Sequence, residues 1–425
     1  MSVIQTGANL TAEDNRLRRA WISVAIMTVI LTLAYADRSA LAVAAPEVRR
    51  DFGLSAVEFG ALSSAFAWPY AISLLLVGGV IDRWGERRLF ALGTILFSVA
   101  QLANGIVSSL WQFFVFRVVL GVGEAPGFMA AARATKMWFK DEEQGLPTGI
   151  WNCSSSLGPA LAPLLFTPLV LVLGWRGMFM TIGAVGLVFS AVWYWYYRES
   201  PVSHGSASPH DKSSGLIKND ITVRQWLSLF RHRSPLFLAI GAFFMGYLNF
   251  TLISWLPQYF ELGRNISVAA TGVLASLPFF AGVAGAIFGG TFADTMTERG
   301  LSRITSCKLG AAGGALLQAL CIIPALLVSN LVLSVVFFSL SQFFHSVSSS
   351  NAWTTVEAVS PPSRVGSVGS IWDFGLFIGS GIGPFVTGVL YQKTGGFLVP
   401  LMMASVGVLL SAGAYWFGVK NEVEA

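Results

Sequence analysis

The sequence has few charged residues. Asp, Glu, Lys and Arg together make up only 12% of its 425 residues, about half the share in ordinary soluble proteins. Hydrophobic residues make up 54%, and the mean hydropathy is +0.65. A soluble globular domain and a disordered chain are both excluded, because neither combines so much apolar surface with so little charge. The composition predicts an all-α membrane protein.

Cysteine and histidine are also scarce. Cys153, Cys307 and Cys321 lie far apart in apolar stretches, which excludes a disulfide framework and a CxxC metal site. Of the four histidines, only His345 lies in an apolar run. The sequence contains no GxSxG, HExxH or GxxxxGK(S/T) motif. These absences predict that the protein is not an enzyme, uses no cofactor or metal and does not hydrolyse ATP.

Twelve apolar runs are long enough to cross a bilayer, for which a helix needs about 20 residues. They fall at 21–45, 60–81, 89–108, 111–136, 146–172, 175–197, 236–260, 269–293, 304–327, 330–357, 365–390 and 396–419. We therefore predict twelve transmembrane helices in two pseudo-symmetric six-helix bundles. The first run follows three arginines, as a signal peptide would, but it is longer than a signal core and contains Asp37 and Arg38. It is interpreted as an uncleaved span.

Polar segments divide the chain into five predicted parts. These are a cytoplasmic N-terminus (1–20), an N-terminal bundle (21–197), a cytoplasmic linker (198–235), a C-terminal bundle (236–419) and a cytoplasmic tail (420–425). Most of the 27 Lys and Arg residues lie before the first span, in the even-numbered loops or after the last span. The positive-inside rule then places both termini in the cytoplasm. The excess of positive charge, +5 in all, is therefore explained by cytoplasmic loops and not by binding to nucleic acid. We predict that the protein lies in the inner (plasma) membrane, with the lipid bilayer as its partner.

The two bundles share an internal repeat. The segment GGVIDR at 78–83, after the second span, is echoed by GGTFAD at 289–294, after the eighth. The displacement that aligns Asp82 with Asp294 also carries Asp37 in the first span onto Asn249 in the seventh. Duplicated bundles with polar residues at matching depth are typical of secondary transporters.

Several motifs give a resemblance to a known family. The loop GGVIDRWGERR at 78–88 resembles the signature between spans 2 and 3 of the major facilitator superfamily. YADR at 35–38, SAFAWPY at 64–70, and RVVLG at 117–121 followed by GEAP at 123–126 resemble its anion:cation symporter family, which includes D-galactonate, other sugar-acid and aromatic-acid proton symporters. The resemblance implies the superfamily fold and proton-coupled uptake of an organic anion by alternating access.

The resemblance also implies roles for particular residues. Substrate-binding positions of the galactonate-type members match Tyr35, Arg38, Tyr70, Ser350 and Trp353. At two further positions this chain departs from relatives, since Asp373 stands where Asn is common and Ser155 stands where some carriers have Gln. Both remain candidates for substrate binding, as does Asn249 through the repeat.

The implied proton sites are Asp37 and Glu124, with Arg117 nearby. The implied gating residues are Asp82 and Arg83 in the signature loop and, through the repeat, Asp294. In the family, contacts of this loop latch the two bundles together in one state of the transport cycle.

Charged side chains within a bilayer are costly and usually face a cavity. The planar guanidinium of Arg38 suits a carboxylate, because it offers two parallel donors. Tyr35 and Arg38 are three residues apart and share a helix face, whereas Asp37 points about 100° away, toward a neighbouring helix. The alternative role for Arg38 is a structural ion pair between helices.

Arg117 and Glu124 are seven residues apart, about 10 Å along a helix, which is too far for a direct bond. We predict that Arg117 pairs with Asp37 and that Glu124 is less compensated and holds a transferable proton. The alternative for Glu124 is a neutral structural hydrogen bond. When all groups are ionised, the carboxylates including Asp373 outnumber Arg38 and Arg117 by one. Protonation would therefore favour anion binding, as a symporter requires.

The role of Asp373 stays open between accepting hydrogen bonds from substrate hydroxyls, screening Arg38 and lying solvated at the end of a span. Tyr70 could join Trp68, Trp353 and Trp372 in an aromatic wall for a sugar face, although anchoring at the lipid interface is a common fate of Trp.

Two small-residue motifs, Gly285-x-x-x-Gly289 and Gly379-x-x-x-Gly383, predict close helix packing. We also expect them to line the surface over which the halves rock.

Three other functions fit the sequence less well than uptake. A proton-driven exporter of a metabolite or drug lacks the arrangement of Arg38 beside Asp37, and a channel or receptor does not account for duplicated halves with paired charges. An enzyme lacks the motifs that it would need. The sequence predicts a monomer whose partners are a small organic anion and protons, without identifying the acid.

Overall fold

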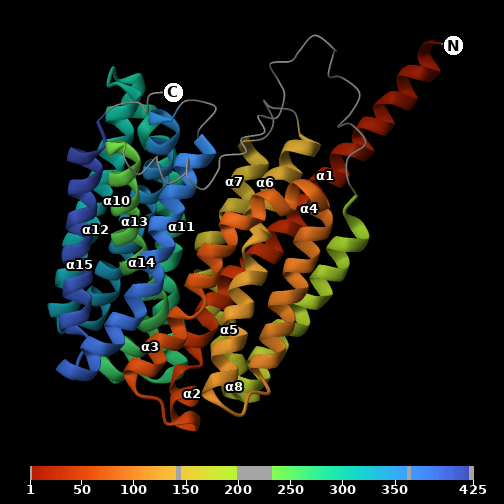
Figure 1. Ribbon diagram of the computed structural model, residues 1–425. Coiled ribbons are helices and arrows are strands. Elements are labelled where there is room, and N and C mark those ends of the chain that lie inside the picture. The colour runs from red at the N-terminus through yellow and green to blue at the C-terminus, as the bar shows by residue number, and fades with distance from the viewer. Residues whose placement is uncertain (1, 140–144, 199–231, 361–364, 421–425) are drawn as a thin grey trace.

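The structure is built from two groups of helices. The computed structural model describes residues 2–139, 145–198, 232–360 and 365–420, and these ranges contain helices and no strand. Figure 1 shows the helices up to α8 on one side of the molecule and those from α10 onward on the other. The predicted all-α membrane fold is confirmed.

The N-terminal half consists of α1 (Ser2–Val43), α2 (Ala45–Phe52), α3 (Ala56–Ser64), α4 (Ala67–Asn104), α5 (Leu110–Glu124), α6 (Pro126–Trp138), α7 (Gly145–Asn152) and α8 (Ser154–Tyr196). The C-terminal half consists of α10 (Arg233–Gln258), the π-helical turn η4 (Tyr259–Gly263), α11 (Val268–Glu298), α12 (Arg303–Leu327), α13 (Leu331–Val359), α14 (Val365–Thr394), α15 (Leu398–Gly413) and the π-helical turn η5 (Ala414–Gly418). Polar caps mark several starts. Side-chain oxygens of Ser109, Ser267 and Asn330 accept backbone N–H groups in the first turns of α5, α11 and α13.

Two long helices each hold two of the predicted spans. α8 has 43 residues, about 65 Å of helix, whereas the hydrocarbon core is about 30 Å thick. α4 and α8 turn at Gly85 (φ 75°) and Gly174 (φ 69°), a conformation that side chains with a Cβ rarely adopt. The described residues contain nine helical segments long and apolar enough to cross a membrane, and one of them is Pro147–Tyr196. Dividing that segment at Gly174 makes ten segments, and the two parts of α4 bring the number to the twelve predicted spans.

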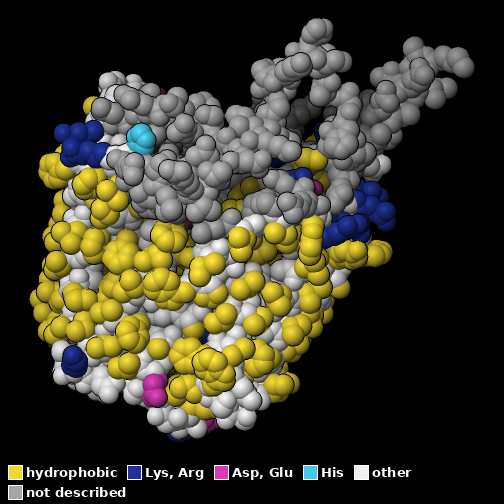
Figure 2. Space-filling model, in the orientation of Figure 1, with side chains coloured by type: hydrophobic (Ala, Val, Ile, Leu, Met, Phe, Trp, Pro, Cys, Tyr) yellow, Lys and Arg dark blue, Asp and Glu magenta, His cyan; other side chains and the backbone are white. Residues whose placement is uncertain are grey.

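The outer surface has the polarity of a multi-pass membrane protein. Figure 2 shows hydrophobic side chains over the middle of the molecule and Lys and Arg toward its two ends. Trp111, near the start of α5, and Trp195, near the end of α8, are 74% and 79% exposed. These are positions at which tryptophan anchors a span at the lipid interface.

The small-residue motifs pack helices closely within the C-terminal half. A Cβ at Gly285 would overlap the backbone of Phe343 in α13, and a Cβ at Gly379 would overlap the backbone of Phe243 in α10. The predicted close packing is confirmed. The expectation that these glycines line the surface between the halves is wrong, because the helices they contact belong to the same half.

The two halves contact each other at the end of the molecule opposite the termini. Figure 1 shows α2 and α3 at the lower end, with α3 beside α14, whereas α1 begins at the upper end. Arg49 Nη1 donates to Gln258 Oε1 at 3.0 Å, and the N–H of Val57 donates to Gln392 Oε1 at 3.4 Å. These two hydrogen bonds join the halves at the lower end, which we call the closed end.

The domain boundaries remain predictions. Most of the predicted linker, residues 199–231, and most of the tail, residues 421–425, lie outside the described part of the chain. α1 begins at Ser2 and continues without interruption into the first span, so the predicted N-terminal segment is helical from that residue.

Candidate functional site

Arg38 lies among aromatic rings inside the N-terminal half. Its Cζ is 4.0 Å from the centre of the Tyr35 ring and 4.8 Å from that of Tyr70. The ring centres of Phe66 and Phe377 lie 5.0 Å and 5.9 Å from the same carbon. The face predicted for Tyr35 and Arg38 is confirmed. Such rings stabilise a cation that has lost most of its water, and the Arg38 side chain is only 4% exposed.

Arg38 forms an ion pair with Glu124, the last residue of α5. Arg38 Nε donates to Glu124 Oε2 at 2.9 Å, and the Glu124 side chain is fully buried. The other carboxylate oxygen, Oε1, has no hydrogen-bond partner in the described residues. The prediction that Glu124 is the less compensated carboxylate is therefore wrong. The seven-residue spacing gave its distance from Arg117 but not which neighbouring helix its side chain faces.

Asp37 points to α4, as its place one residue before Arg38 predicts. Its Oδ1 accepts a hydrogen bond from Gln101 Nε2, and Gln101 Oε1 accepts one from Asn104 Nδ2 at 2.8 Å. The predicted pair with Arg117 is not formed as a hydrogen bond, because Nε and Nη1 of Arg117 have no such partner in the described residues. The Gln101 amide takes only Oδ1 of Asp37, and Oδ2 has no hydrogen-bond partner in the described residues.

α8 crosses α1 beside this cluster at Gly158. A Cβ there would overlap the Tyr35 side chain and the backbone of Thr32, so the glycine lets the two helices approach at the Tyr35 position. Ser155 lies one turn earlier in α8, and its hydroxyl donates to the carbonyl of Asn152 at 2.9 Å. Its hydroxyl hydrogen is therefore used by the last residue of α7 (Gly145–Asn152).

The predicted residues of the C-terminal half come from α10, α13 and α14. Asn249 Oδ1 accepts a hydrogen bond from Gln342 Nε2 at 3.3 Å, and the hydroxyl of Ser350 donates to the carbonyl of Ala286 at 3.5 Å. Trp353 is 40% exposed.

The predicted aromatic wall divides into two groups. Tyr70 packs on Phe377 with ring centres 4.3 Å apart, and Trp353 meets Trp372 edge to face at 5.7 Å. Trp68 lies against Gly381 instead.

Asp373 is a half-buried carboxylate on α14. Its carboxylate makes no ion pair or hydrogen bond within the described ranges, so screening of Arg38 by direct pairing is not observed. It lies four residues, about one helical turn, before Phe377, whose ring is 5.9 Å from Arg38 Cζ, so it lies on the face of α14 nearest the Arg38 cluster. The choice between a hydrogen-bond acceptor and a solvated group remains a prediction.

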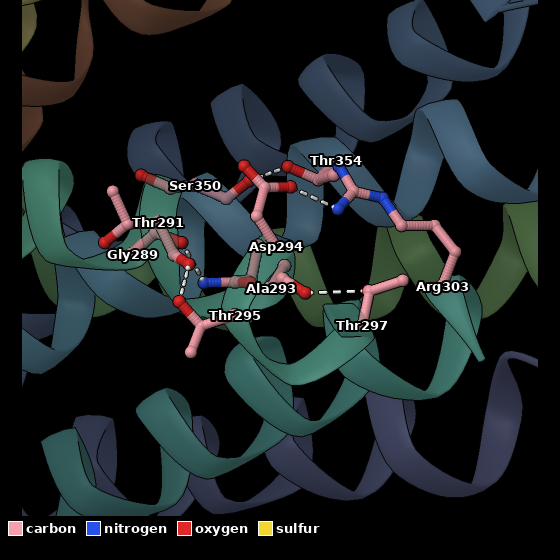
Figure 3. A network of polar contacts seen from close by, with 10 residues as sticks. Gly289, Thr291, Ala293, Asp294, Thr295, Thr297, Arg303, Ser350 and Thr354 are labelled. Carbon is pink, nitrogen blue, oxygen red and sulfur yellow. Dashed lines mark hydrogen bonds and ion pairs between the residues drawn. The ribbon is translucent and has the colours of Figure 1, made fainter. Parts of the chain in front are cut away.

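The gating residues are described only in part. Asp82 and Arg83 belong to α4, but their side chains lie outside the described part of the structure. Asp294, at the end of α11, forms an ion pair with Arg303, at the start of α12, as Figure 3 shows. Both side chains are largely exposed, at 62% and 45%. Asp294 is therefore held within its own half in this conformation, and its gating role stays a prediction.

Sequence reasoning missed a buried carboxylate in the signature loop. Glu86 is 2% exposed. It accepts hydrogen bonds from Arg133 Nε at 3.0 Å and from the Tyr197 hydroxyl at 2.7 Å, which tie α4 to α6 and to the end of α8. A Glu beside Arg87 and Arg88 has the appearance of a solvated loop residue, so the sequence alone carries no signal for this burial.

The cluster suits binding and exchange rather than bond chemistry. The described residues contain no group of three or more His, Cys, Asp or Glu side chains placed to hold a metal ion. Two arginines and two carboxylates lie buried together in α1 and α5, and a third carboxylate approaches from α14. Such groups can bind a proton and an anion reversibly without forming a covalent intermediate.

Comparisons with known proteins agree along almost the whole chain. The family model of the Major Facilitator Superfamily matches residues 27–368. The chain is 29% identical over 419 residues to the "Probable L-galactonate transporter" of Escherichia coli (strain K12), covering 97% of this chain and 92% of that protein. It is 27% identical over 423 residues to the "Probable galactarate/D-glucarate transporter GarP" of the same strain, covering 94% and 95%.

A solved structure supports the same arrangement of helices. The crystal structure of a bacterial homologue of the human lysosomal transporter Spinster, in an inward-facing and unoccupied conformation, superposes with a TM-score of 0.80. The match covers 94% of this chain and 97% of that one at 19% sequence identity. At that identity the likeness shows the fold.

Proposed function

Because the chain belongs to the Major Facilitator Superfamily, and so is a multi-pass membrane transporter rather than an enzyme, we propose that it takes up an organic anion together with protons. The substrate that we infer is a sugar acid or a related carboxylate. Two relatives of similar length are named for sugar acids, and the rings of Tyr35 and Tyr70 beside Arg38 offer flat surfaces to a sugar.

The observation that carries the proposal is the ion pair between Arg38 and Glu124. A substrate carboxylate and the Glu124 carboxylate compete for the same buried guanidinium. When Glu124 takes up a proton it loses its charge, and Arg38 becomes available to the substrate. By linkage, a bound anion equally favours protonation of Glu124, so the pair couples the two ligands without any further group.

The charges of the site support the same coupling. With every group ionised, Arg38 and Arg117 face Asp37, Glu124 and Asp373, which leaves one net negative charge. An anion enters this environment unfavourably. Protonation of two carboxylates changes the sum to one net positive charge, which favours the anion. Glu124 is the first candidate for the proton that moves, because its protonation is the one that releases the Arg38 guanidinium.

Orientation and assembly follow from the charge distribution and from the completeness of the site. We place the protein in the inner membrane with both termini in the cytoplasm, because most Lys and Arg lie on that side. The closed end with Arg49 and Gln258 then faces outward. Since one chain supplies both halves of the site, we infer that it works as a monomer.

Glu124→Gln tests the coupling. The amide resembles the protonated acid and cannot release a proton, so exchange of labelled for unlabelled substrate across a proteoliposome membrane should persist. Accumulation driven by a pH difference should fall to background. Glu298→Gln, at an exposed site, is the matched control and should behave like the parent.

Two results would contradict the proposal. If Glu124→Gln still concentrates substrate with a pH difference as the sole driving force, the proton moves elsewhere. If the parent moves labelled acid out of vesicles against its gradient when protons flow in, the protein is an exporter.

A further inference from the structure

A cluster of uncharged polar side chains lies buried in the C-terminal half. Gln342 and His345 in α13 are 3% and 9% exposed, and Gln342 hydrogen-bonds Asn249 in α10. Two atoms of the cluster are unsatisfied within the described residues, namely Gln342 Oε1 and His345 Nδ1. Buried polar atoms usually have partners, and leaving them without any is costly. A ligand with hydroxyl groups would supply what these atoms lack.

The cluster lies on the helix face that the resemblance assigns to substrate. Gln342, Ser346, Ser350 and Trp353 follow one another at steps of four, four and three residues, so they share one face of α13. Gln342 is about 12 Å from Ser350 along the helix, toward the closed end of the molecule. The face expected to bind substrate therefore continues more than two turns beyond the residues that the sequence identified.

One aromatic layer separates this cluster from Arg38. Phe250, next to Asn249 in α10, packs against Phe377 with ring centres 6.1 Å apart. Phe377 in turn lies 5.9 Å from Arg38 Cζ. A substrate held by Arg38 through its carboxylate would extend across these two rings toward the amide and imidazole cluster.

The internal repeat gives the cluster a counterpart in the N-terminal half. Gly158-Pro159 in α8 and Gly383-Pro384 in α14 also pair, with a slightly longer displacement than the one from Asp82 to Asp294, and this longer displacement carries Arg117 onto Gln342. Asn249 is the counterpart of Asp37 by the displacement from Asp82 to Asp294. Where the first half holds an acid and an arginine, the second half holds two amides. The two halves therefore present different chemistry to the two ends of a bound molecule.

No cation in this part of the C-terminal half is placed to receive a second anionic group. In the described residues of α10, α11, α13 and α14, Lys and Arg occur only at Arg233 and Lys393, at the ends of helices. The Asp373 carboxylate, one helical turn from Phe377 on α14, would repel a second carboxylate.

We propose that Asn249, Gln342 and His345 bind the hydroxyl groups at the uncharged end of the substrate and make the carrier selective for hydroxylated monocarboxylates over dicarboxylates. This inference rests on the proposed function. It narrows the substrate class within the sugar acids, because one relative described above is named for a monocarboxylate, galactonate, and the other for dicarboxylates, galactarate and D-glucarate.

The test measures binding of D-galactonate, galactarate and hexanoate to the purified protein by isothermal titration. The parent should bind galactonate at least about tenfold more tightly than galactarate, and also more tightly than hexanoate, which has no hydroxyl group. In Gln342→Leu and His345→Phe, galactonate affinity should fall about tenfold, whereas hexanoate affinity should stay within twofold. Gln318→Leu is the matched control, because Gln318 in α12 is also buried with an unsatisfied amide, and it should leave both affinities unchanged.

A variant that gains affinity for a ligand cannot be explained by poor folding. Gln342→Arg restores the charge of its counterpart, Arg117, and should raise galactarate affinity relative to galactonate by at least about tenfold. Equal parental affinity for galactonate and galactarate would overturn the inference. So would losses in Gln342→Leu and His345→Phe no larger than in Gln318→Leu, or Gln342→Arg without any gain for galactarate. A parent that binds none of the three acids would overturn the proposed function as well, which separates the two failures.

Discussion

The ring of Phe377 in the C-terminal half lies 5.9 Å from the guanidinium carbon of Arg38 in the N-terminal half. The centre of the same ring lies 4.3 Å from that of Tyr70. One side chain of α14 therefore packs beside two of the residues predicted to bind substrate. An anion that binds at Arg38 therefore alters a contact between the halves directly. If the substrate binds at Arg38, as proposed, its binding and the relative position of the halves would be coupled at this residue.

Arg38→Lys should severely weaken binding of the substrate. Lysine keeps the charge but loses the planar fork that binds a carboxylate through two donors and that packs on Tyr35 and Tyr70. We expect affinity for carboxylates to fall at least about tenfold, measured by ligand-induced thermal stabilisation. Arg176→Lys, at an exposed ion pair with Asp51, serves as the control. Unchanged affinity in Arg38→Lys for every carboxylate would show that Arg38 has a structural role.

Asp373→Asn should change either binding or coupling. The substitution removes one negative charge from a carboxylate that interacts with Tyr35, so the net charge of the site rises by one. If Asp373 accepts substrate hydroxyls, uptake falls. If it titrates, anion binding needs fewer protons and becomes less dependent on pH. Affinity measured from pH 5 to 8 distinguishes the two, and a variant identical to the parent in both respects would show that Asp373 is a solvated group.

Gly388→Ala should open the end of the molecule that is closed. A Cβ at Gly388 in α14 would overlap the backbone oxygen of Ala56 at the start of α3, across the interface between the halves. We expect initial uptake rates in proteoliposomes to fall several-fold, because the closed arrangement becomes less favourable. A Cβ at Gly396 would meet nothing within 4 Å, so Gly396→Ala is the control. Equal rates in both variants would mean that this contact does not limit transport.

Asp51→Asn should have a small effect that disappears only in strong acid. The hydrogen bond from Trp175, aided by Arg176, holds the pKa of Asp51 below its usual value of about 3.8. Because the folded state has the lower pKa, the stabilisation is present above pH ~4 and is lost as the pH falls through the depressed value. For such an exposed group it is under ~1 kcal/mol.

Thermal unfolding of Asp51→Asn and the parent checks this. The difference in melting temperature should be constant from pH 8 to pH 5 and shrink below pH 4. A difference that disappears between pH 8 and pH 5 would contradict the depressed pKa.

The helices and the face of Arg38 could be predicted because they depend on spacing along one chain. Apolar runs indicated the spans. The three-residue interval between Tyr35 and Arg38 placed both on one helix face, and in the structure Arg38 Cζ lies 4.0 Å from the centre of the Tyr35 ring. Gly85 and Gly174 also fall in the gaps between predicted spans, where the chain must turn.

The choice of ionic partners could not be predicted from the sequence. Whether Arg38 or Arg117 meets Glu124 depends on how α1 and α5 are rotated against each other, and helix spacing says nothing about that rotation. Gln101, which bonds Asp37, gave no signal because a single amide in an apolar run has no characteristic pattern. Glu86 was missed for a similar reason, since its burial depends on Tyr197, more than a hundred residues later.

The amide pair of Asn249 and Gln342 has a consequence for how such carriers change over time. In this chain the counterparts of Asp37 and Arg117 in the second copy are amides, so the proposed proton-coupling groups lie in the copy with α1 and α5. The other copy is then free to accept substitutions that alter the cargo without disconnecting the protein from its energy source. New substrates should therefore arise in this lineage through changes in α10 and α13.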